Sequence, residues 1–321
     1  MILLIAGIIL TLLGASMLIY LTIGTAQNRK NKDKQNTQTV DTPVYTNDIS
    51  VNTDDLSGKT IEVVKDDASP ENMTVYPDIK IGNAQDIGAR EEQQDSFGIS
   101  NIDDQVISER GILAVVADGM GGMSNGSQYS RLTVQSALQS FNTEMPEKDD
   151  ETTLLRVLKR VTDAVSNAGL EDGGSTLIAA LIHNQMLHFI SIGDSRIYLM
   201  RNGGLIQLNR EHVYGRELDD MVANGLKDAD EAAADPQRAA LTSYIGIPTE
   251  MKVDRNIRPI PLYSGDKIIL MSDGVYGYIP EDEMKELLFN EPMAAAEAIR
   301  NAILAKQYPH QDNMTIVILE I

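Results

Sequence analysis

The chain contains no cysteine, and this absence excludes several kinds of chemistry at once. Without thiols there can be no disulfide bond, no thiolate zinc site, no iron–sulfur cluster and no cysteine nucleophile. Histidine is also scarce, with four residues among 321. A histidine-rich metal site is therefore disfavoured. Any metal ion must be held mainly by carboxylate and carbonyl oxygens, the ligands that Mg²⁺, Mn²⁺ and Ca²⁺ prefer.

Positive charge is the second shortage. The 27 lysines and arginines face 47 acidic residues, which leaves a formal charge of −20. An acidic surface repels a phosphate backbone, so nucleic acid is not an expected partner. The hydrophobic content of 42% and the 24 glycines are typical of a globular protein and exclude wholesale disorder. The length suits one large domain with appendages, or two small domains.

The beginning of the chain lacks charged side chains, because the first of them is that of Arg29. Residues 2–24 are almost wholly apolar, and this run is long enough for the roughly 20 helical residues that span a bilayer. A cleaved signal peptide would carry a basic start and a shorter apolar stretch. A buried soluble helix would need an apolar partner surface all round it. The sequence therefore predicts a transmembrane helix within residues 1–28.

A basic cluster follows this segment, formed by Arg29, Lys30, Lys32 and Lys34. Basic residues favour the cytoplasmic side of a membrane and attract anionic lipid headgroups. The expected localisation is therefore the cell membrane, with a single pass and a cytoplasmic C-terminal domain. Residues 29–75 comprise this basic cluster and a following stretch rich in Asn, Gln, Thr, Asp and Ser. The stretch shows no sustained hydrophobic period and is expected to be a flexible linker.

Residues 76–321 show the pattern of a folded domain. Short β-rich apolar runs lie at 112–117, 176–182, 187–192, 197–200, 267–271 and 314–319. Turn-forming residues at 183–185 and 202–204 predict hairpins. Helical periodicity at 134–141 and 154–161 predicts two helices, and two more are expected at 281–289 and 292–306. Strands cluster into hairpins and helices into pairs, which favours an α+β architecture over alternating βαβ units.

Aspartates follow three of the predicted strands and precede a fourth. Asp118–Gly119, Asp194 and Asp273–Gly274 come at strand ends, whereas Asp312 comes just before the last strand. A single Asp–Gly pair is commonly a simple turn. Gathering carboxylates at one end of a sheet is costly unless a cation neutralises them, and hard divalent cations prefer such oxygen-rich sites. Glycine after aspartate also lets the backbone carbonyl approach a metal ion.

Six segments resemble, in order, the motif set of the metal-dependent PPM, or type 2C, protein phosphatases: 88–100 (GAREEQQDSFGIS), 115–122 (VVADGMGG), 173–182 (GGSTLIAALI), 191–199 (SIGDSRIYL), 269–279 (ILMSDGVYGYI) and 311–319 (QDNMTIVIL). This resemblance implies a four-layer α-β-β-α sandwich of two antiparallel sheets flanked by helix pairs. It also implies hydrolysis of phosphoserine and phosphothreonine in proteins by a metal-activated water, at a site of two Mn²⁺ or Mg²⁺ ions with a more weakly held third.

The resemblance gives each motif residue a role. Asp118 would bridge the two ions, and Arg90 would grip the substrate phosphate with its planar guanidinium. The remaining candidates would hold the ions or support their ligands: the carbonyl of Gly119, Asp273, Asp312, Asp95 acting through water, Asp194 for the third ion, and Asn313, which would orient Asp312.

Plain structural roles compete with some of these assignments. Arg90 could instead form a surface ion pair with Glu91 or Glu92. The glycine-rich residues 173–176 look superficially like a phosphate loop, but no lysine follows and the Walker spacing is missing. They are expected to open a core strand. Structural roles are also expected for Ser195, Arg196, Gly121 and Gly122.

Three features depart from the family pattern or vary within it. Met120 stands where many eukaryotic members have a histidine usable as a general acid, so the leaving group must be protonated by water or another group. Gln93 stands where asparagine is more usual. Residues 211–249 match the variable flap beside the site, and substrate choice is expected to reside there.

The expected partners are phosphoserine and phosphothreonine proteins, among them membrane Ser/Thr kinases and their substrates, together with membrane lipid around the N-terminal helix. Two other classes stay open from the sequence. One is a catalytically silent PPM-like module with a sensory or binding role, and the other is an acidic metal-binding structural domain. Loss of a core aspartate would signal the silent module, and none is lost.

Overall fold

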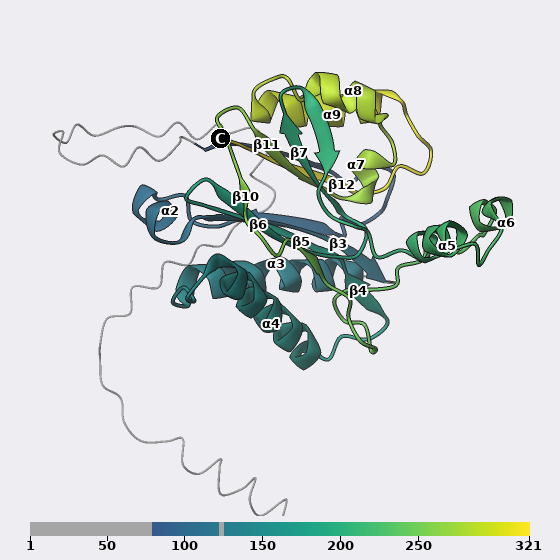
Figure 1. The fold of residues 1–321 in the computed structure, drawn as a ribbon, viewed down its shortest axis with the longest axis horizontal. Coiled ribbons are helices and arrows are strands. Elements are labelled where there is room, and N and C mark those ends of the chain that lie inside the picture. Colours follow the sequence, from purple (N-terminus) through teal and green to yellow (C-terminus); the bar gives the residue numbers. More distant parts are fainter. Residues whose placement is uncertain (1–78, 122–124) are drawn as a thin grey trace, which may run out of the picture. The chain divides into compact units, whose positions relative to one another are not determined.

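The computed structural model describes residues 79–121 and 125–321 (Figure 1). The predicted transmembrane helix, the basic cluster, the linker and Gly122 lie outside these described residues. Among the helices that are described, none is both long enough and apolar enough to cross a membrane.

Two antiparallel sheets form the centre of the domain. The first has the strand order β1-β12-β11-β7-β8, and the second has the order β10-β6-β5-β3-β2, with β4 paired to β3 and β9 paired to β6. The strands of the first sheet are β1 (Lys80–Asp86), β12 (Met314–Glu320), β11 (Lys267–Met271), β7 (Arg196–Arg201) and β8 (Gly204–Gln207). Those of the second are β10 (Ile260–Pro261), β6 (Met186–Ile192), β5 (Leu177–His183), β3 (Ile112–Gly121), β2 (Asp95–Ile99), β4 (Gly173–Ser175) and β9 (Asp254–Arg255).

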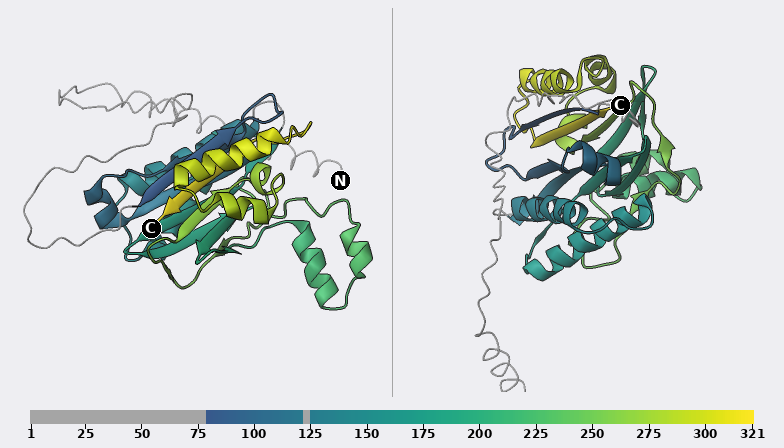
Figure 2. Two further views of the ribbon diagram at one scale, coloured as in Figure 1. Left: turned by 90° about the horizontal axis from the view of Figure 1, so that it is seen from above. Right: turned by 90° about the vertical axis from the view of Figure 1, so that its left-hand side faces the viewer.

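Helices cover the outer face of each sheet (Figures 1 and 2). The long helices α3 (Asn125–Thr143) and α4 (Asp150–Ala168) share a hydrophobic cluster with β3, β5 and β6. The helices α8 (Glu281–Leu287) and α9 (Pro292–Ala305), with the short α7 (Asp273–Tyr276), share another with β11 and β12. A further helix, α2 (Asp104–Arg110), precedes β3. The layers therefore run α-β-β-α, which confirms the predicted sandwich.

Alternation along β3 shows how the layers are held together. Leu113 and Val115 belong to the cluster beneath α3 and α4, whereas Ile112 and Ala114 belong to the cluster between the two sheets. Successive side chains of a strand point to opposite faces, so both faces of β3 are buried. This burial explains why the strand appears in the sequence as a continuous apolar run.

The predicted helices are present, and local signals bound them. In α4 the side chain of Asp149 accepts a hydrogen bond of 2.7 Å from the backbone N–H of Thr152, and Gly169 follows the helix with a φ of 65°. An N-terminal acidic cap and a left-handed glycine after the last turn satisfy backbone groups at the helix ends. The predicted hairpin turns are also present, with positive φ at Asn184 and Asn202.

The prediction that a strand ends at Asp118–Gly119 is wrong. Strand β3 continues to Gly121, because its last residues pair with β4. Glycine is required at 119 because a Cβ there would lie 2.0 Å from the carbonyl oxygen of Gly126, at the beginning of α3. Sequence reasoning also missed the strands β1, β2 and β8, whose apolar content is low or whose length is short.

Candidate metal centre and phosphate site

The fold brings five aspartates to one end of the two sheets. Asp95, the first residue of β2, lies directly across from Asp118 of β3. The other three are Asp194 in the β6–β7 loop, Asp273 at the beginning of α7, and Asp312 just before β12. Asp118 interacts electrostatically with all four of the others. The structure therefore gathers all the aspartates that the sequence analysis selected.

The carboxylates of this cluster make one another harder to ionise. Burial, together with the charge of Asp273, raises the pKa of Asp194 to about 7. Burial also raises the pKa of Asp95 to about 7, although a hydrogen bond from Ser272 opposes the shift. The pKa of Asp118 is raised well above its usual value, first by burial and then by its acidic neighbours. Ionisation of the whole cluster thus requires a compensating positive charge.

Asp95 shows that the site suits a hydrated cation. Its side chain is 4% exposed, and Oδ2 accepts a hydrogen bond of 2.7 Å from the Ser272 hydroxyl. The other oxygen, Oδ1, is buried and has no hydrogen-bond partner among the described residues. A buried, unpaired carboxylate oxygen is costly unless a donor or cation reaches it. This fits the role in which Asp95 acts through water.

The clustered aspartates do not by themselves form a complete set of ligands for one ion. Among the residues that the structure describes, no three Asp, Glu or His side chains are grouped closely enough to hold one ion by themselves. An ion at this end must therefore complete its shell with water or backbone carbonyls. Mg²⁺ and similar hard cations commonly keep several waters, so a donor set made wholly of oxygen fits them.

Arg90 lies at the edge of the aspartate cluster. Its Nη2 is 2.6 Å from Oδ2 of Asp312, and its side chain is 57% exposed. The alternative pairing with Glu91 or Glu92 is wrong, because among the described residues the ion pair of Arg90 is with Asp312. The carboxylate of Glu92 accepts a hydrogen bond of 2.5 Å from the Ser127 hydroxyl. An exposed guanidinium held beside the acidic cluster is available to a phosphate that arrives there.

Asn313 holds the loop that carries Arg90. Its side-chain Oδ1 accepts a hydrogen bond of 2.7 Å from the backbone of Gln94, and its Nδ2 donates one of 2.9 Å to the carbonyl of Ile87. Its backbone N–H donates to Oδ1 of Asp312 at 2.8 Å. Asn313 thus contacts both ends of the loop as well as Asp312. The sequence predicted only the contact with Asp312.

Two supporting residues were missed by sequence reasoning. The hydroxyl of Ser272 donates to Asp95 and accepts a hydrogen bond of 3.0 Å from the backbone of Thr315, so it links strands of both sheets. The hydroxyl of Tyr278 accepts a hydrogen bond of 3.3 Å from the backbone N–H of Asp312. Ser272 precedes Asp273 in the motif ILMSDG, which was the one available signal.

Several residues have the structural roles that the sequence predicted. Residues 173–175 form the core strand β4, as expected, and not a phosphate loop. The hydroxyls of Ser195 and Thr176 are 2.8 Å apart, and Thr176 also accepts a hydrogen bond of 2.9 Å from the backbone of Asp118. Gln93 accepts a hydrogen bond of 3.0 Å from the backbone of Asp95, so glutamine still supports the loop where asparagine is usual.

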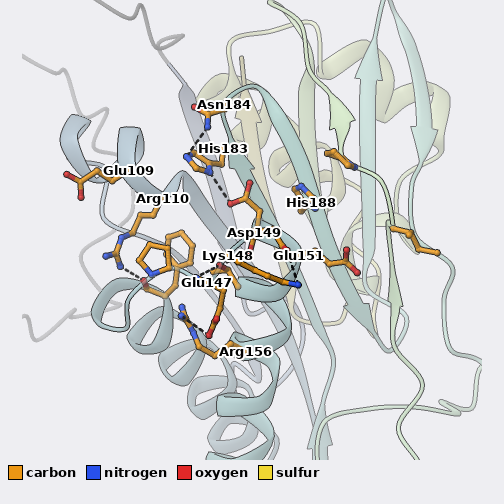
Figure 3. A pocket seen from close by; sticks show the side chains of 16 residues that line it. Glu109, Arg110, Glu147, Lys148, Asp149, Glu151, Arg156, His183, Asn184 and His188 are labelled. Atoms are coloured by element: carbon orange, nitrogen blue, oxygen red, sulfur yellow. Dashed lines mark hydrogen bonds and ion pairs between the residues drawn. The ribbon is translucent and has the colours of Figure 1, made fainter.

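A pocket of about 550 Å³ lies away from the aspartates, where α2 ends and α4 begins, next to the β5–β6 turn (Figure 3). His183 lies 3.0 Å from a carboxylate oxygen of Asp150. Arg110 and Arg156, labelled in Figure 3, donate hydrogen bonds to backbone carbonyls at and just after the end of α3. None of the five aspartates lines this pocket. This pocket is therefore separate from the aspartate cluster, which lies at the other end of β3.

Comparison with known proteins decides what kind of site this is. The family profile described as "Protein phosphatase 2C" matches residues 85–307. The chain belongs to the protein phosphatase 2C family. A curated relative in this family, the serine/threonine phosphatase stp of Listeria monocytogenes, is 28% identical over 240 residues, which cover 72% of this chain and 91% of the relative.

Solved structures of protein phosphatase 2C relatives share the fold. The serine/threonine phosphatase PstP/Ppp of Mycobacterium tuberculosis matches with a TM-score of 0.61 at 25% identity, over 76% of this chain and 98% of that one. A structure of the catalytic domain of PstP in complex with two manganese ions matches with a TM-score of 0.58, also at 25% identity, over 75% and 97% of the two chains. Family membership makes the present chain a protein serine/threonine phosphatase.

Arg90→Ala should raise KM for a phosphopeptide about tenfold, with a smaller effect on kcat. The guanidinium would contact the phosphate already in the bound substrate, so its loss weakens binding of substrate and transition state alike. Steady-state kinetics measure the effects on KM and kcat separately. Arg258→Ala, an exposed arginine beside the distant pocket, is the matched control and should leave both constants unchanged. Unchanged kinetics for Arg90→Ala would remove this residue from the site.

Proposed function

We propose that this chain is a membrane-anchored protein phosphatase that hydrolyses phosphoserine and phosphothreonine in proteins at a binuclear Mn²⁺ or Mg²⁺ site. The observation that carries the proposal is the gathering of five mutually repelling aspartates at one end of two sheets, with Arg90 at their edge. Loss of a core aspartate would signal the catalytically silent alternative, and all five are present.

The ligand set follows from this arrangement. Asp118, the carbonyl of Gly119, Asp273 and Asp312 would hold the two ions, Asp95 would act through water, and Asp194 would serve a weaker third ion. When bound, the ions supply an activated water and neutralise charge on the phosphoryl oxygens. PstP, a relative with a solved structure, holds two manganese ions, which supports two ions here.

The protein's own residues bind and orient the substrate. Arg90 would exchange its ion pair with Asp312 for a bidentate contact with the substrate phosphate, which is the favoured geometry for a guanidinium. Asn313 keeps the Arg90 loop in place through its two amide contacts. Ser272 fixes Oδ2 of Asp95, so that the unpaired Oδ1 stays directed to the site. Met120 cannot donate a proton, so the leaving group would be protonated by water or by another group.

The substrate preference should follow the charge of the domain. Phosphothreonine peptides that carry Lys or Arg should be hydrolysed several-fold faster, in kcat/KM at low salt, than acidic counterparts of equal length, because like charges slow encounter. Phosphate release measured for both peptides over a salt series tests this. The difference should shrink toward physiological salt, where screening acts over about 8 Å. A preference for acidic peptides would contradict the proposal.

Membrane anchoring rests on the apolar run over 2–24 and on the basic cluster Arg29, Lys30, Lys32 and Lys34. This arrangement would place the phosphatase beside membrane Ser/Thr kinases and their substrates. We expect the chain to sediment with membranes and to resist protease added outside intact cells, while being digested after lysis. A chain deleted of residues 2–24 is the control and should be found in the soluble fraction. Digestion by protease added outside intact cells would contradict the proposed cytoplasmic location of the domain.

A further inference from the structure

The flap joins the domain close to the aspartate cluster. Its helices α5 (Tyr214–Ala223) and α6 (Ala229–Ala233) project from the sandwich (Figures 1 and 2). Two isolated bridges hold its base: Val213 pairs with Leu241, and Ile245 pairs with Ser175 at the end of β4. These backbone contacts fix the base of the flap and leave open what sets the direction of α5.

Glu211, at the root of the flap, is the most deeply buried acid of this region. Its side chain is 4% exposed and lies between two guanidinium groups. Nε of Arg216, on α5, donates to it at 2.8 Å, and Nη2 of the same residue also contacts it. Nε of Arg196, on β7, lies 2.7 Å from its other oxygen. One buried carboxylate therefore joins the flap helix to the central sheet.

Arg196 extends this connection toward the loop of Asp194. Its guanidinium lies 3.7 Å from the centre of the Tyr276 ring, a cation–π contact. The hydroxyl of Tyr276 then donates a hydrogen bond of 3.1 Å to the backbone carbonyl of Asp194. Tyr276 belongs to α7, the helix that begins with Asp273. The connection from α5 thus reaches two elements that carry aspartates of the cluster.

A second connection leads from Glu211 to the same loop along the backbone. The next residue, His212, donates its backbone N–H to the carbonyl of Gly193 at 2.8 Å. Its Nδ1 accepts a hydrogen bond of 3.2 Å from the N–H of Gly193. Gly193 has a φ of +100°, which only glycine adopts readily, and it immediately precedes Asp194. The loop of Asp194 is therefore held by Tyr276 on one side and by the root of the flap on the other.

We propose that Glu211 is a positioning residue that couples the flap to the Asp194 loop, so that the direction of α5 and the geometry of the weaker ion site are set together. This inference rests on the proposed function, in which Asp194 serves that ion and the flap selects the substrate. Glu211 is buried, whereas the side chains of Arg196 and Arg216 are 27% and 41% exposed. Removing the charge of Glu211 leaves these two partly buried guanidinium groups without the carboxylate that joins them. Loss of the Glu211 charge should therefore loosen both elements, although Glu211 is not among the residues proposed to hold the ions or the substrate phosphate.

The test uses Glu211→Gln in the full-length chain. Amide hydrogen exchange over residues 214–223 should become about tenfold faster, because α5 loses its buried anchor. The Mn²⁺ concentration that gives half-maximal activity should rise about tenfold. KM for a phosphopeptide should also rise. KM for para-nitrophenyl phosphate, which is too small to reach the flap, should change less than about twofold. Calorimetry should show that the tight Mn²⁺ sites are retained.

Two further variants separate positioning from general damage. On α5, Oε1 of Glu217 lies 2.6 Å from Nζ of Lys252 and forms an exposed ion pair. Glu217→Gln removes this pair and should leave hydrogen exchange over α5 unchanged. Glu211→Asp keeps the charge on a shorter side chain and should restore the Mn²⁺ requirement in part. Unchanged exchange in Glu211→Gln, or equal effects in Glu217→Gln, would overturn the inference. Because exchange needs no turnover, failure of the phosphatase proposal would be seen separately, as absent activity in the unsubstituted chain.

Discussion

Asp118→Asn should lower kcat by about 10³-fold or more, equivalent to about 4 kcal/mol of transition-state stabilisation. Asp118 lies across from Asp95 and interacts with the other four aspartates, and in the proposed site it would be the ligand shared by both ions. Asparagine keeps the shape of the side chain and removes its charge. Phosphopeptide turnover at saturating Mn²⁺ measures the effect.

The same variant should be more stable than the unsubstituted chain when cations are removed. The charge of Asp118 is repelled by its neighbours in the absence of metal, and its removal relieves that repulsion. A higher Tm in EDTA combined with lost turnover would show that activity was lost at the site and not through unfolding. Asp104→Asn, an exposed acid of α2, is the control and should change neither quantity. Turnover within tenfold of normal for Asp118→Asn would contradict its bridging role.

Removing divalent cations with EDTA should abolish turnover and make stability depend on pH. The pKa values of Asp95 and Asp194 are raised to about 7 in the folded chain, mainly by burial, from the ordinary value of 3.8. Between these values the folded state holds protons that the unfolded state releases. The free energy of unfolding of the chelated chain should therefore fall as pH rises from about 4 to about 7, and level off above.

Mn²⁺ should remove most of this decline, because the ions compensate the carboxylate charges. At a Mn²⁺ concentration about 100 times the dissociation constant, the gain is about 3 kcal/mol, which corresponds to roughly 5–10 °C in Tm for a domain of this size. Thermal unfolding followed by circular dichroism gives the Tm at pH 5.5 and at pH 8, in EDTA and in Mn²⁺. Full activity in excess chelator, or a Tm in EDTA that rises with pH, would contradict the two-ion site.

Much of the fold was predictable because burial leaves a regular pattern in the sequence. The run 267–271 was predicted as a strand and is β11 without change, since both of its faces are covered. The helix predicted at 292–306 is α9, which ends at Ala305. In contrast, β1 contains Gly82, Asn83 and Gln85 among its seven residues, so its sequence has no apolar pattern, and it becomes a strand by pairing along its length with β12.

The sequence by itself determined which chemistry is available: an acidic chain without cysteine, with aspartates at strand ends in a recognisable order of motifs. Motifs and periodicity involve residues close together in the sequence, so they can be recognised without the folded structure. Only the tertiary structure decided that β3 continues past Asp118 to pair with β4, that Arg90 pairs with Asp312, and that Glu211 lies buried between Arg196 and Arg216. These contacts join residues from separate elements, and local sequence patterns carry no information about which distant partners folding will bring together.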